Sequence, residues 1–316
     1  MHDNIENLEN ALKQAASPKE ELHALLALSD FQSDHEIVDG WNYGKRALRI
    51  AEKLKLKKEW ARAHELIGIC LRKLTEYPEA LIHLELALDS YLGSGALYGV
   101  ARCSCGMGIV CGSMEEIRTS LDYFEEALSA CRRAQRDKLA ATVVGNIGHC
   151  YFQLGRYQDA KERFQHAIDF YDKTGGGVPK ANMIGGLAGV HVFTGEFEKG
   201  LDAIYRAKEL YRQANDNQGL SVAMMNQGLT YQKMGHLPKA KSTLIQALAL
   251  ARSIQFVVTE LDSLKYLSDV CLELGQEEEA QKYLREYMES EREERMQEAN
   301  IKAMQIQKRQ LLRKSH

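Results

Sequence analysis

The sequence predicts an all-α fold, in which about seven helical hairpins stack side by side as an α-solenoid. Three observations predict it. Small and large residues recur with a period of 40 residues, and no insertion interrupts the series. Within each period, apolar residues follow the three- and four-residue spacing of helices. Glycine and proline fall where those helices would end and begin. A single hairpin buries too little surface to fold alone, so each copy needs its neighbours.

The period is clearest in residues 146–171, which read NIGHCYFQLGRYQDAKERFQHAIDFY. Gly148 and Tyr151 share one face of a first helix, Gly155 marks the turn, and Phe164 lies on the inner stripe of a second helix. Steps of 40 from Gly148 reach Gly68, Gly108, Ala188, Gly228 and Ser268, with Leu28 as the one large residue. The same steps from Ala167 reach Ala47, Ala87, Ala127, Ala207 and Ala247, and then Tyr287.

The remaining elements follow this register. Residues 4–15 form an amphipathic helix that we expect to cover the open end of the stack. The four prolines, Pro18, Pro78, Pro179 and Pro238, mark helix starts, where a missing N–H costs little. Gly95, Gly175 and Asn215 follow second helices, where a left-handed residue ends a helix. We therefore expect a capping helix in residues 1–18, the array in residues 19–290 and a helical extension in residues 291–316.

The extension has two interpretations. Residues 288–316 contain no glycine or proline, and their charge changes from acidic to basic along the chain. Met296, Ala299, Ala303 and Ile306 are spaced as on a coiled-coil seam. The segment is either a solvated last helix that caps the array, or a connector that forms a homodimer through a coiled coil. Two heptads are too few to decide between them.

The order of small residue, aromatic, glycine, aromatic, alanine, aromatic and alanine resembles the tetratricopeptide repeat (TPR). That family has a period of about 34 residues, so each helix here is about three residues longer. The longer units resemble those of peptide-binding TPR proteins and of the TPR sensor and regulatory regions of bacterial signalling proteins. The resemblance covers residues 20–290. It implies a right-handed α-solenoid whose first helices line a concave groove.

The resemblance also implies where a ligand would bind. Asn146 and Asn226 occupy one register of the first helices, where an asparagine in peptide-binding members grips peptide backbone. The cations of this face would favour an acidic group or a C-terminal carboxylate. The alternative is that these side chains are only solvated. The candidate ligand-binding residues are Arg62, Arg72, Lys73, Arg102, Asn146, His149, Gln153, Asn182, Asn226, Lys233 and Lys265.

Composition argues against several classes of function. A net charge of -3 gives no reason to expect nucleic acid or an anionic membrane as a partner. Residues 1–20 lack the apolar core of a signal peptide, and no apolar run is long enough for a membrane span. An odd number of cysteines, seven, suits reduced thiols in the cytoplasm. Cys103, Cys105 and Cys111 lack a fourth ligand, so we expect neither metal nor cofactor.

The sequence predicts a non-enzymatic scaffold that binds a peptide or a protein in the groove of the array. No nucleophile, base and orienting group are spaced as in a catalytic site. The alternative function is that of a regulatory module, which senses a ligand and transmits through a dimerising C-terminal helix to an output domain absent from this chain.

Overall fold

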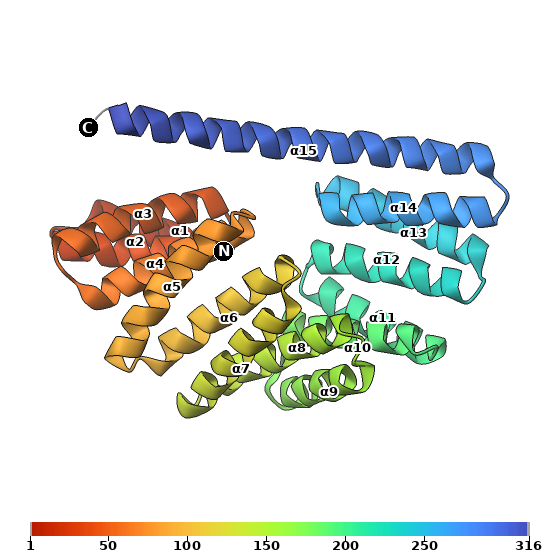
Figure 1. Cartoon of the computed structure of the whole chain (residues 1–316), viewed down its shortest axis with the longest axis horizontal. Coiled ribbons are helices and arrows are strands. Elements are labelled where there is room, and N and C mark those ends of the chain that lie inside the picture. The colour runs from red at the N-terminus through yellow and green to blue at the C-terminus, as the bar shows by residue number, and fades with distance from the viewer. Residues whose placement is uncertain (1, 315–316) are drawn as a thin grey trace. The chain divides into compact units, whose positions relative to one another are not determined.

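The computed structural model describes residues 2–314, and the side chains of residues 5–296 among them. The described residues form fifteen α-helices and no strand (Figure 1), which confirms the predicted fold class. The helices are α1 (His2–Lys13), α2 (Pro18–Gln32), α3 (Ile37–Lys53), α4 (Lys57–Lys73), α5 (Tyr77–Ser94), α6 (Leu97–Ser113), α7 (Ile117–Arg133), α8 (Asp137–Gln153), α9 (Tyr157–Thr174), α10 (Gly177–Phe193), α11 (Phe197–Gln213), α12 (Asn217–Lys233), α13 (Leu237–Ser253), α14 (Val257–Glu273) and α15 (Glu277–Lys314).

The helices after α1 follow one another as the members of seven hairpins, from α2–α3 to α14–α15. Successive helices pack against each other from α2 to α8 and again from α10 to α15, as the period predicts. The first helix, α1, packs against α2, and its Leu12 contacts a core cluster that contains Leu22 and Leu25. The chain divides into two compact units, residues 1–167 and residues 168–316, and the division falls within α9. No helix among the described residues has the length and apolar character needed to cross a bilayer.

Left-handed residues end the helices at intervals of 20. Gly95, Gly175 and Asn215 have positive φ, as predicted. The complete series is Lys55, Thr75, Gly95, Glu115, Gln135, Gly155, Gly175, Gly195, Asn215, Gly235, Gln255 and Gly275. Pro18 begins α2, while Pro78, Pro179 and Pro238 lie in the first turns of α5, α10 and α13, which confirms the predicted helix starts.

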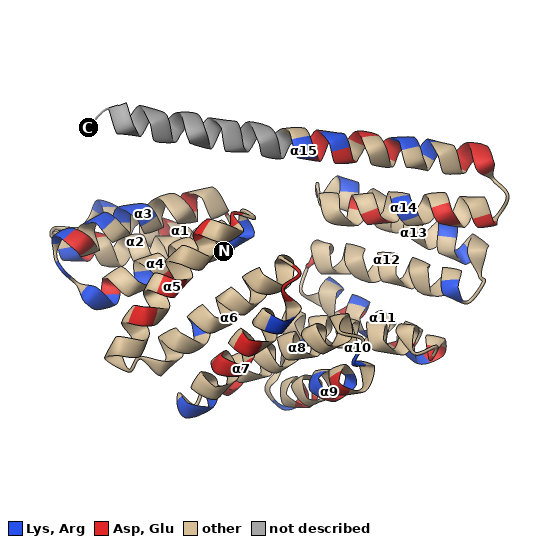
Figure 2. Cartoon of the chain, viewed as in Figure 1, with Lys and Arg blue, Asp and Glu red and all other residues tan. Residues whose placement is uncertain are grey.

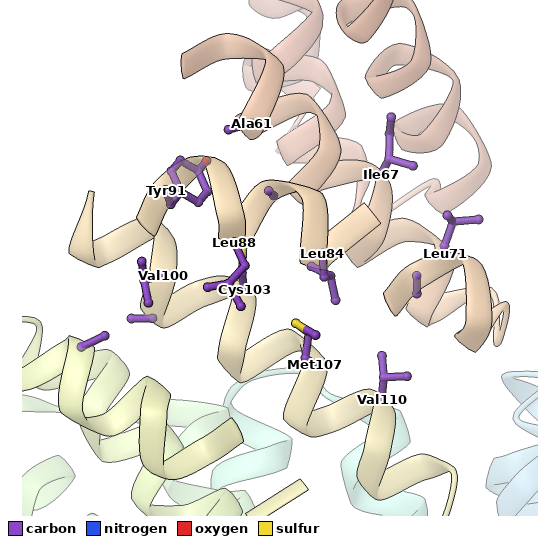
Figure 3. Packing of buried hydrophobic residues seen from close by; sticks show 14 of the residues in the cluster. Ala61, Ile67, Leu71, Leu84, Leu88, Tyr91, Val100, Cys103, Met107 and Val110 are labelled. Carbon is purple, nitrogen blue, oxygen red and sulfur yellow. The ribbon is translucent and has the colours of Figure 1, made fainter. Parts of the chain in front are cut away.

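The small residues of the period allow large side chains to pack against helix backbone. A Cβ atom at Gly108 would lie 2.8 Å from the Phe124 ring, and one at Gly148 would lie 3.0 Å from Phe164. Phe164 itself is fully buried. Figure 3 shows how α4, α5 and α6 contribute to one such core in the first unit, where Leu84 and Met107 are both buried. The close fit of small and large residues therefore holds the two helices of a hairpin together, and in the first unit α6 also packs against the preceding hairpin.

The first hairpin departs from the register, and this accounts for its irregular sequence. Helix α2 ends at Gln32, one residue earlier in the register than α4, α6 and α8. Ser29 takes the place of the small residue and donates a hydrogen bond of 2.7 Å to the Gly40 carbonyl oxygen. Leu28 beside it is fully buried. A Cβ atom at Gly40 would lie 2.9 Å from the backbone nitrogen of Ser33, so this close approach requires glycine.

At the other end, α15 continues the seventh hairpin without a break at the predicted boundary of residue 290. It is 38 residues long, whereas the other helices of the hairpins have 15 to 18. Of the predicted seam residues, Met296 is exposed, and Ala299, Ala303 and Ile306 lie outside the described side chains.

Candidate ligand-binding face

The first helices of the hairpins contact one another in the first unit. Helix α4 contacts both α2 and α6, and α6 contacts α8. We call the surface that α2, α4, α6 and α8 form the first-helix face. Seven of the predicted residues, from Arg62 to Gln153, belong to these helices. Figure 2 shows that charge is unevenly distributed over them, and α6 carries a single charged residue, Arg102.

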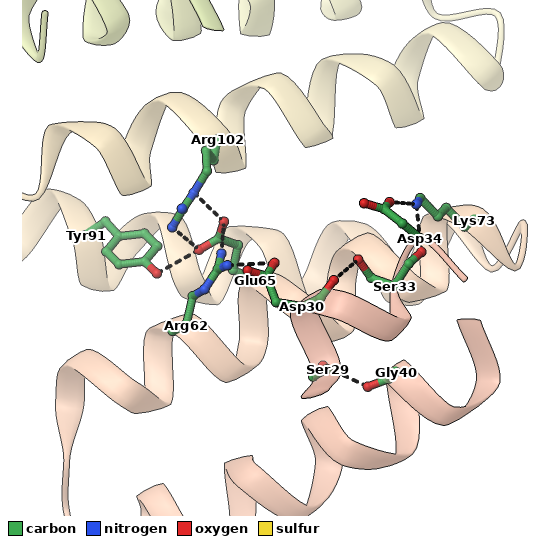
Figure 4. A network of polar contacts seen from close by, with 10 residues as sticks. All are labelled: Ser29, Asp30, Ser33, Asp34, Gly40, Arg62, Glu65, Lys73, Tyr91 and Arg102. Atoms are coloured by element: carbon green, nitrogen blue, oxygen red, sulfur yellow. Dashed lines mark hydrogen bonds and ion pairs between the residues drawn. The ribbon is translucent and has the colours of Figure 1, made fainter. Parts of the chain in front are cut away.

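Two of the predicted cations bind a buried carboxylate. Glu65 on α4 is fully buried, and its Oε1 lies 2.7 Å from Nη1 of Arg62 and 2.6 Å from Nε of Arg102 (Figure 4). The Tyr91 hydroxyl donates a hydrogen bond of 2.8 Å to Oε2 of the same carboxylate. Arg62 also pairs with Asp30 at 2.8 Å. Burial disfavours the charge of Arg62, but Glu65 and Asp30 outweigh it, so the pKa of Arg62 is raised.

Lys73 is also neutralised within the chain. It pairs with Asp34 and donates a hydrogen bond of 2.7 Å to the Ser33 carbonyl oxygen. Arg72, which directly precedes Lys73, differs from Arg62, Lys73 and Arg102 in its lack of an ion pair among the described residues. No side chain among the described residues pairs with its guanidinium, and its buried Nε has no hydrogen-bond partner. Burial lowers the pKa of Arg72.

A basic pocket of about 570 Å³ adjoins Arg62 and Arg102. Two guanidinium groups contact the Tyr98 ring, with the Cζ atom of Arg102 4.5 Å and that of Arg136 4.7 Å from its centre. Lys58 adds a further cation to the lining. Sequence reasoning missed Lys58, Tyr98 and Arg136 because it considered only the middle of each first helix. Lys58 and Tyr98 lie one period of 40 residues apart, each in the first turn of a first helix. This shared position is the feature of the sequence that could have identified them.

A second, smaller pocket of about 310 Å³ brings together Asn146, His149 and Gln153. These three predicted residues come from α8, and Ile109 and Gly112 of α6 lie opposite. His149 packs edge-on against Phe164, with 4.7 Å between the ring centres. The pocket therefore combines amide groups, which both donate and accept hydrogen bonds, with a ring and apolar wall atoms.

The amide of Asn146 makes only a weak side-chain hydrogen bond among the described residues. Its Nδ2 lies 3.9 Å from the Cys105 sulfur, which is a weak acceptor, and no other side-chain partner is present among the described residues. The structure thus leaves most of the hydrogen-bonding capacity of this amide unused within the first unit.

The other predicted residues belong to the second unit. Asn182 on α10 accepts a hydrogen bond of 2.7 Å from the Tyr211 hydroxyl. Asn226 on α12 is partly buried, and its side-chain amide has no partner among the described residues. Nζ of Lys233 lies 5.3 Å from the centre of the Phe193 ring, and Lys265 on α14 is exposed. Asn182 therefore has a strong hydrogen bond within the chain, whereas the amides of Asn226 and Asn146 have no strong side-chain partner among the described residues.

The second unit also holds a polar cluster that sequence reasoning missed. Nζ of Lys208, a buried side chain on α11, lies 2.5 Å from Oε1 of Gln227 on α12. Gln227 in turn donates to the hydroxyls of Tyr205 and Tyr231, which are 2.8 Å apart. Burial lowers the pKa of Lys208. The cluster joins neighbouring hairpins through neutral partners, and its residues gave no motif in the sequence.

The cysteines offer neither a metal site nor a reactive thiol. All seven are buried and unpaired, and the described residues contain no group of three potential metal ligands. Burial raises the pKa of several of these thiols, including Cys70 to about 11 and Cys131 to about 11. A thiol with a raised pKa is a poor nucleophile at neutral pH.

Stacked hairpins, each packed on the next, define a helical-repeat protein. The family model described as "Tetratricopeptide repeat" matches residues 59–133, 99–173 and 180–253, which together make up more than half of the sequence. The chain belongs to the tetratricopeptide repeat family. Among curated proteins it is similar to Protein KINESIN LIGHT CHAIN-RELATED 1 of Arabidopsis thaliana, with 22% identity over 204 residues. The match covers 62% of this chain and spans only 33% of that relative.

Solved structures share the fold at low sequence identity. The apo form of the quorum sensor NprR from B. thuringiensis has a TM-score of 0.73 and 18% identity, over 92% of this chain and 81% of that one. A Rap protein complexed with Competence and Sporulation Factor also has a TM-score of 0.73, with 17% identity over 90% of this chain and 78% of that one. At these identities the likeness establishes the fold alone.

Proposed function

We propose that the chain is a non-catalytic cytoplasmic scaffold that binds an extended peptide, or such a segment of a partner protein, on the first-helix face. The single observation that carries the proposal is the pocket of Asn146, His149 and Gln153. Its amides project from one helix, and the Asn146 amide has only a weak partner in the chain. An extended peptide presents alternating N–H and C=O groups, which an amide can satisfy together.

The size of the site suits this class of ligand. A volume of about 310 Å³ is at the lower end of the range for small-ligand pockets and admits one or two peptide side chains. The relatives support the same class. One Rap protein was solved with a factor bound, and NprR is described as a quorum sensor.

Affinity selection with the full chain tests the proposal. A library of random decapeptides is passed over the immobilised protein, and retained peptides are identified by mass spectrometry and titrated by calorimetry. We expect Asn146→Ala to weaken the binding of retained peptides by about tenfold, the effect of one lost hydrogen-bonding group. Gln158→Ala is the matched control, since that amide is exposed on α9 and pairs with Glu162. Failure of the wild-type chain to retain any peptide would refute the proposal.

A regulatory module is the second candidate, and the length of α15 favours it. This helix has 38 residues, about twice as many as its counterparts in the other hairpins. In this alternative, ligand binding to the array is transmitted through a homodimer of the C-terminal helix. Light scattering of the full chain decides: a dimer has twice the monomer mass of 35.7 kDa. A monomer mass at all concentrations tested excludes transmission by dimerisation.

A further inference from the structure

The basic pocket that adjoins Arg62 and Arg102 is distant from the pocket of Asn146. Tyr98 lines the first pocket and Gly112 lines the second, and both residues belong to α6. With a rise of about 1.5 Å per residue, these two positions are roughly 20 Å apart along the helix. The basic pocket is therefore a separate site, which the proposed peptide site does not explain.

Part of the charge of the basic pocket is neutralised within the chain. The described residues that line it include no Asp or Glu and four cations, which are Lys58, Arg62, Arg102 and Arg136. The buried carboxylate of Glu65 lies 2.7 Å from Nη1 of Arg62 and 2.6 Å from Nε of Arg102. Asp30 pairs with Arg62 at 2.8 Å. These two carboxylates offset two of the four positive charges.

The other two cations have no internal partner. Lys58 lies in the first turn of α4, and Arg136 directly precedes α8. Both side chains are exposed, and neither forms an ion pair among the described residues. The first turn of α6, which also lines the pocket, contains no acidic residue to oppose the positive end of the helix dipole. The pocket therefore keeps a surplus of about two positive charges after the internal pairs are formed.

Two of the guanidinium groups meet at one aromatic ring. The Cζ atom of Arg102 on α6 lies 4.5 Å from the centre of the Tyr98 ring, and that of Arg136, at the start of the next first helix, lies 4.7 Å from it. Packing on one ring holds both guanidinium planes close together. A carboxylate has two coplanar oxygens, which a single guanidinium already matches, whereas the three terminal oxygens of a phosphate accept from several donors at once.

We propose that the basic pocket binds a phosphate monoester, with Lys58 and Arg136 as the cations that neutralise it and Arg102 as a further donor. Such a group carries about two negative charges at neutral pH, which matches the surplus of the pocket. The pocket has a volume of about 570 Å³, so it has room for the phosphate and for part of the group that carries it.

Two sources share this chemistry, a phosphorylated residue of a protein segment and a small phosphate ester. The experiment separates them by calorimetric titration of the full chain with three probes at low salt. The probes are glycerol phosphate, a short glycine–serine peptide with one phosphoserine, and the same peptide with Glu in place of the phosphoserine. We expect the phosphopeptide to bind at least about tenfold more tightly than the Glu peptide.

The affinity for glycerol phosphate identifies the source. If it equals that of the phosphopeptide, the pocket recognises the phosphate of a small molecule. If the phosphopeptide binds about tenfold more tightly, the pocket also contacts the peptide, and the source is a phosphorylated residue.

A pair of double variants tests the assigned cations. Lys58→Gln with Arg136→Gln should weaken binding of the phosphate probes by about tenfold or more. Neither residue has an ion pair to lose among the described residues, so an unchanged unfolding temperature is expected. Arg49→Gln with Arg118→Gln is the matched control, since it removes the same charge from exposed positions on the second helices α3 and α7. Its affinity should remain within about twofold of the wild-type value.

Three results would overturn the proposal. They are the failure of the wild-type chain to bind either phosphate probe, equal affinities for the phosphopeptide and the Glu peptide, and equal losses in the two double variants. Retention of unphosphorylated peptides and its dependence on Asn146 are measured separately, so either proposed site can fail while the other stands.

Discussion

The carboxylate of Glu65, on α4, lies 2.6 Å from Nε of Arg102, on α6, and the Glu65 side chain is fully buried. The two residues are 37 positions apart and belong to consecutive hairpins. Their ion pair therefore joins one repeat to the next through charge, in addition to the apolar contacts. Breaking a buried pair leaves an unsatisfied charge, which makes the contact essential once it is present.

Arg102→Met should lower the free energy of unfolding by about 3 kcal/mol, because Glu65 loses one of its two cationic partners while remaining buried. Urea unfolding followed by circular dichroism measures the change. Arg132→Met on α7 is the control and should alter stability by less than about 0.5 kcal/mol. Equal urea midpoints for wild type and Arg102→Met would show that the pair contributes nothing.

Arg72→Met should leave stability unchanged or raise it, in contrast to Arg102→Met. Among the described residues the Arg72 guanidinium has no ion pair to lose, and the methionine removes a partly desolvated charge. The same urea experiment applies, with both variants measured side by side. A loss comparable to that of Arg102→Met would reveal a structural role for Arg72.

Thr75→Gly should raise the free energy of unfolding by about 1 kcal/mol. Thr75 has a φ of 60°, a conformation that a β-branched residue adopts only with strain and glycine adopts freely. Thermal and urea unfolding measure the gain. The reverse change, Gly155→Ala at a φ of 72°, should cost about as much, although open space surrounds that position. Two changes of the same sign would contradict the explanation.

Acidification should destabilise the protein through His64, a buried histidine that contacts the half-buried His83. Nδ1 of His64 lies 2.9 Å from Nδ1 of His83, and burial together with His83 lowers the pKa of His64 from 6.5 to about 4. Since the folded pKa is below the unfolded one, full stability is present above about pH 6.5 and is lost as the pH falls toward 4. Between about pH 8 and about pH 5 this histidine should cost about 2 kcal/mol.

His64→Gln should flatten this pH dependence, as urea midpoints across the range would show. His166→Gln, at an exposed position on α9, is the control and should keep the wild-type profile. A His64→Gln profile parallel to that of the wild type would mean that the pair does not titrate in this range.

The period predicted the hairpins because every copy repeats the same packing of small against large residues. It did not predict all of the turns. Glycine and asparagine identify a left-handed residue, but Lys55 and Glu115 adopt the same conformation with no such preference, so only the register reveals them. The shortened end of α2 escaped prediction because Ser29 and Leu28 are neighbours, and only three-dimensional packing decides which one faces Gly40.

The sequence predicted which residues share a helix face, but it did not predict which of their charges are paired within the chain. Asn146, His149 and Gln153 share one helix, so their spacing alone brought them together, and the structure shows one pocket. Arg62 and Arg102 looked equivalent to Arg72 in the sequence, because helix spacing does not show that Glu65 of one repeat reaches Arg102 of the next. Pairing across repeats depends on side-chain conformation and burial, which the pattern does not contain.

The regular spacing of the left-handed residues has a consequence for how such a chain changes length. Gly95 and Gln135 end equivalent helices with the same backbone conformation and lie 40 residues apart. If the segment between them were deleted or duplicated, the new junction would join two helix ends of the same backbone conformation, so the connection would not be strained. A whole hairpin is therefore the unit that recombination can remove or duplicate in this molecule. The number of repeats can change in this way while the backbone conformation at each junction stays the same.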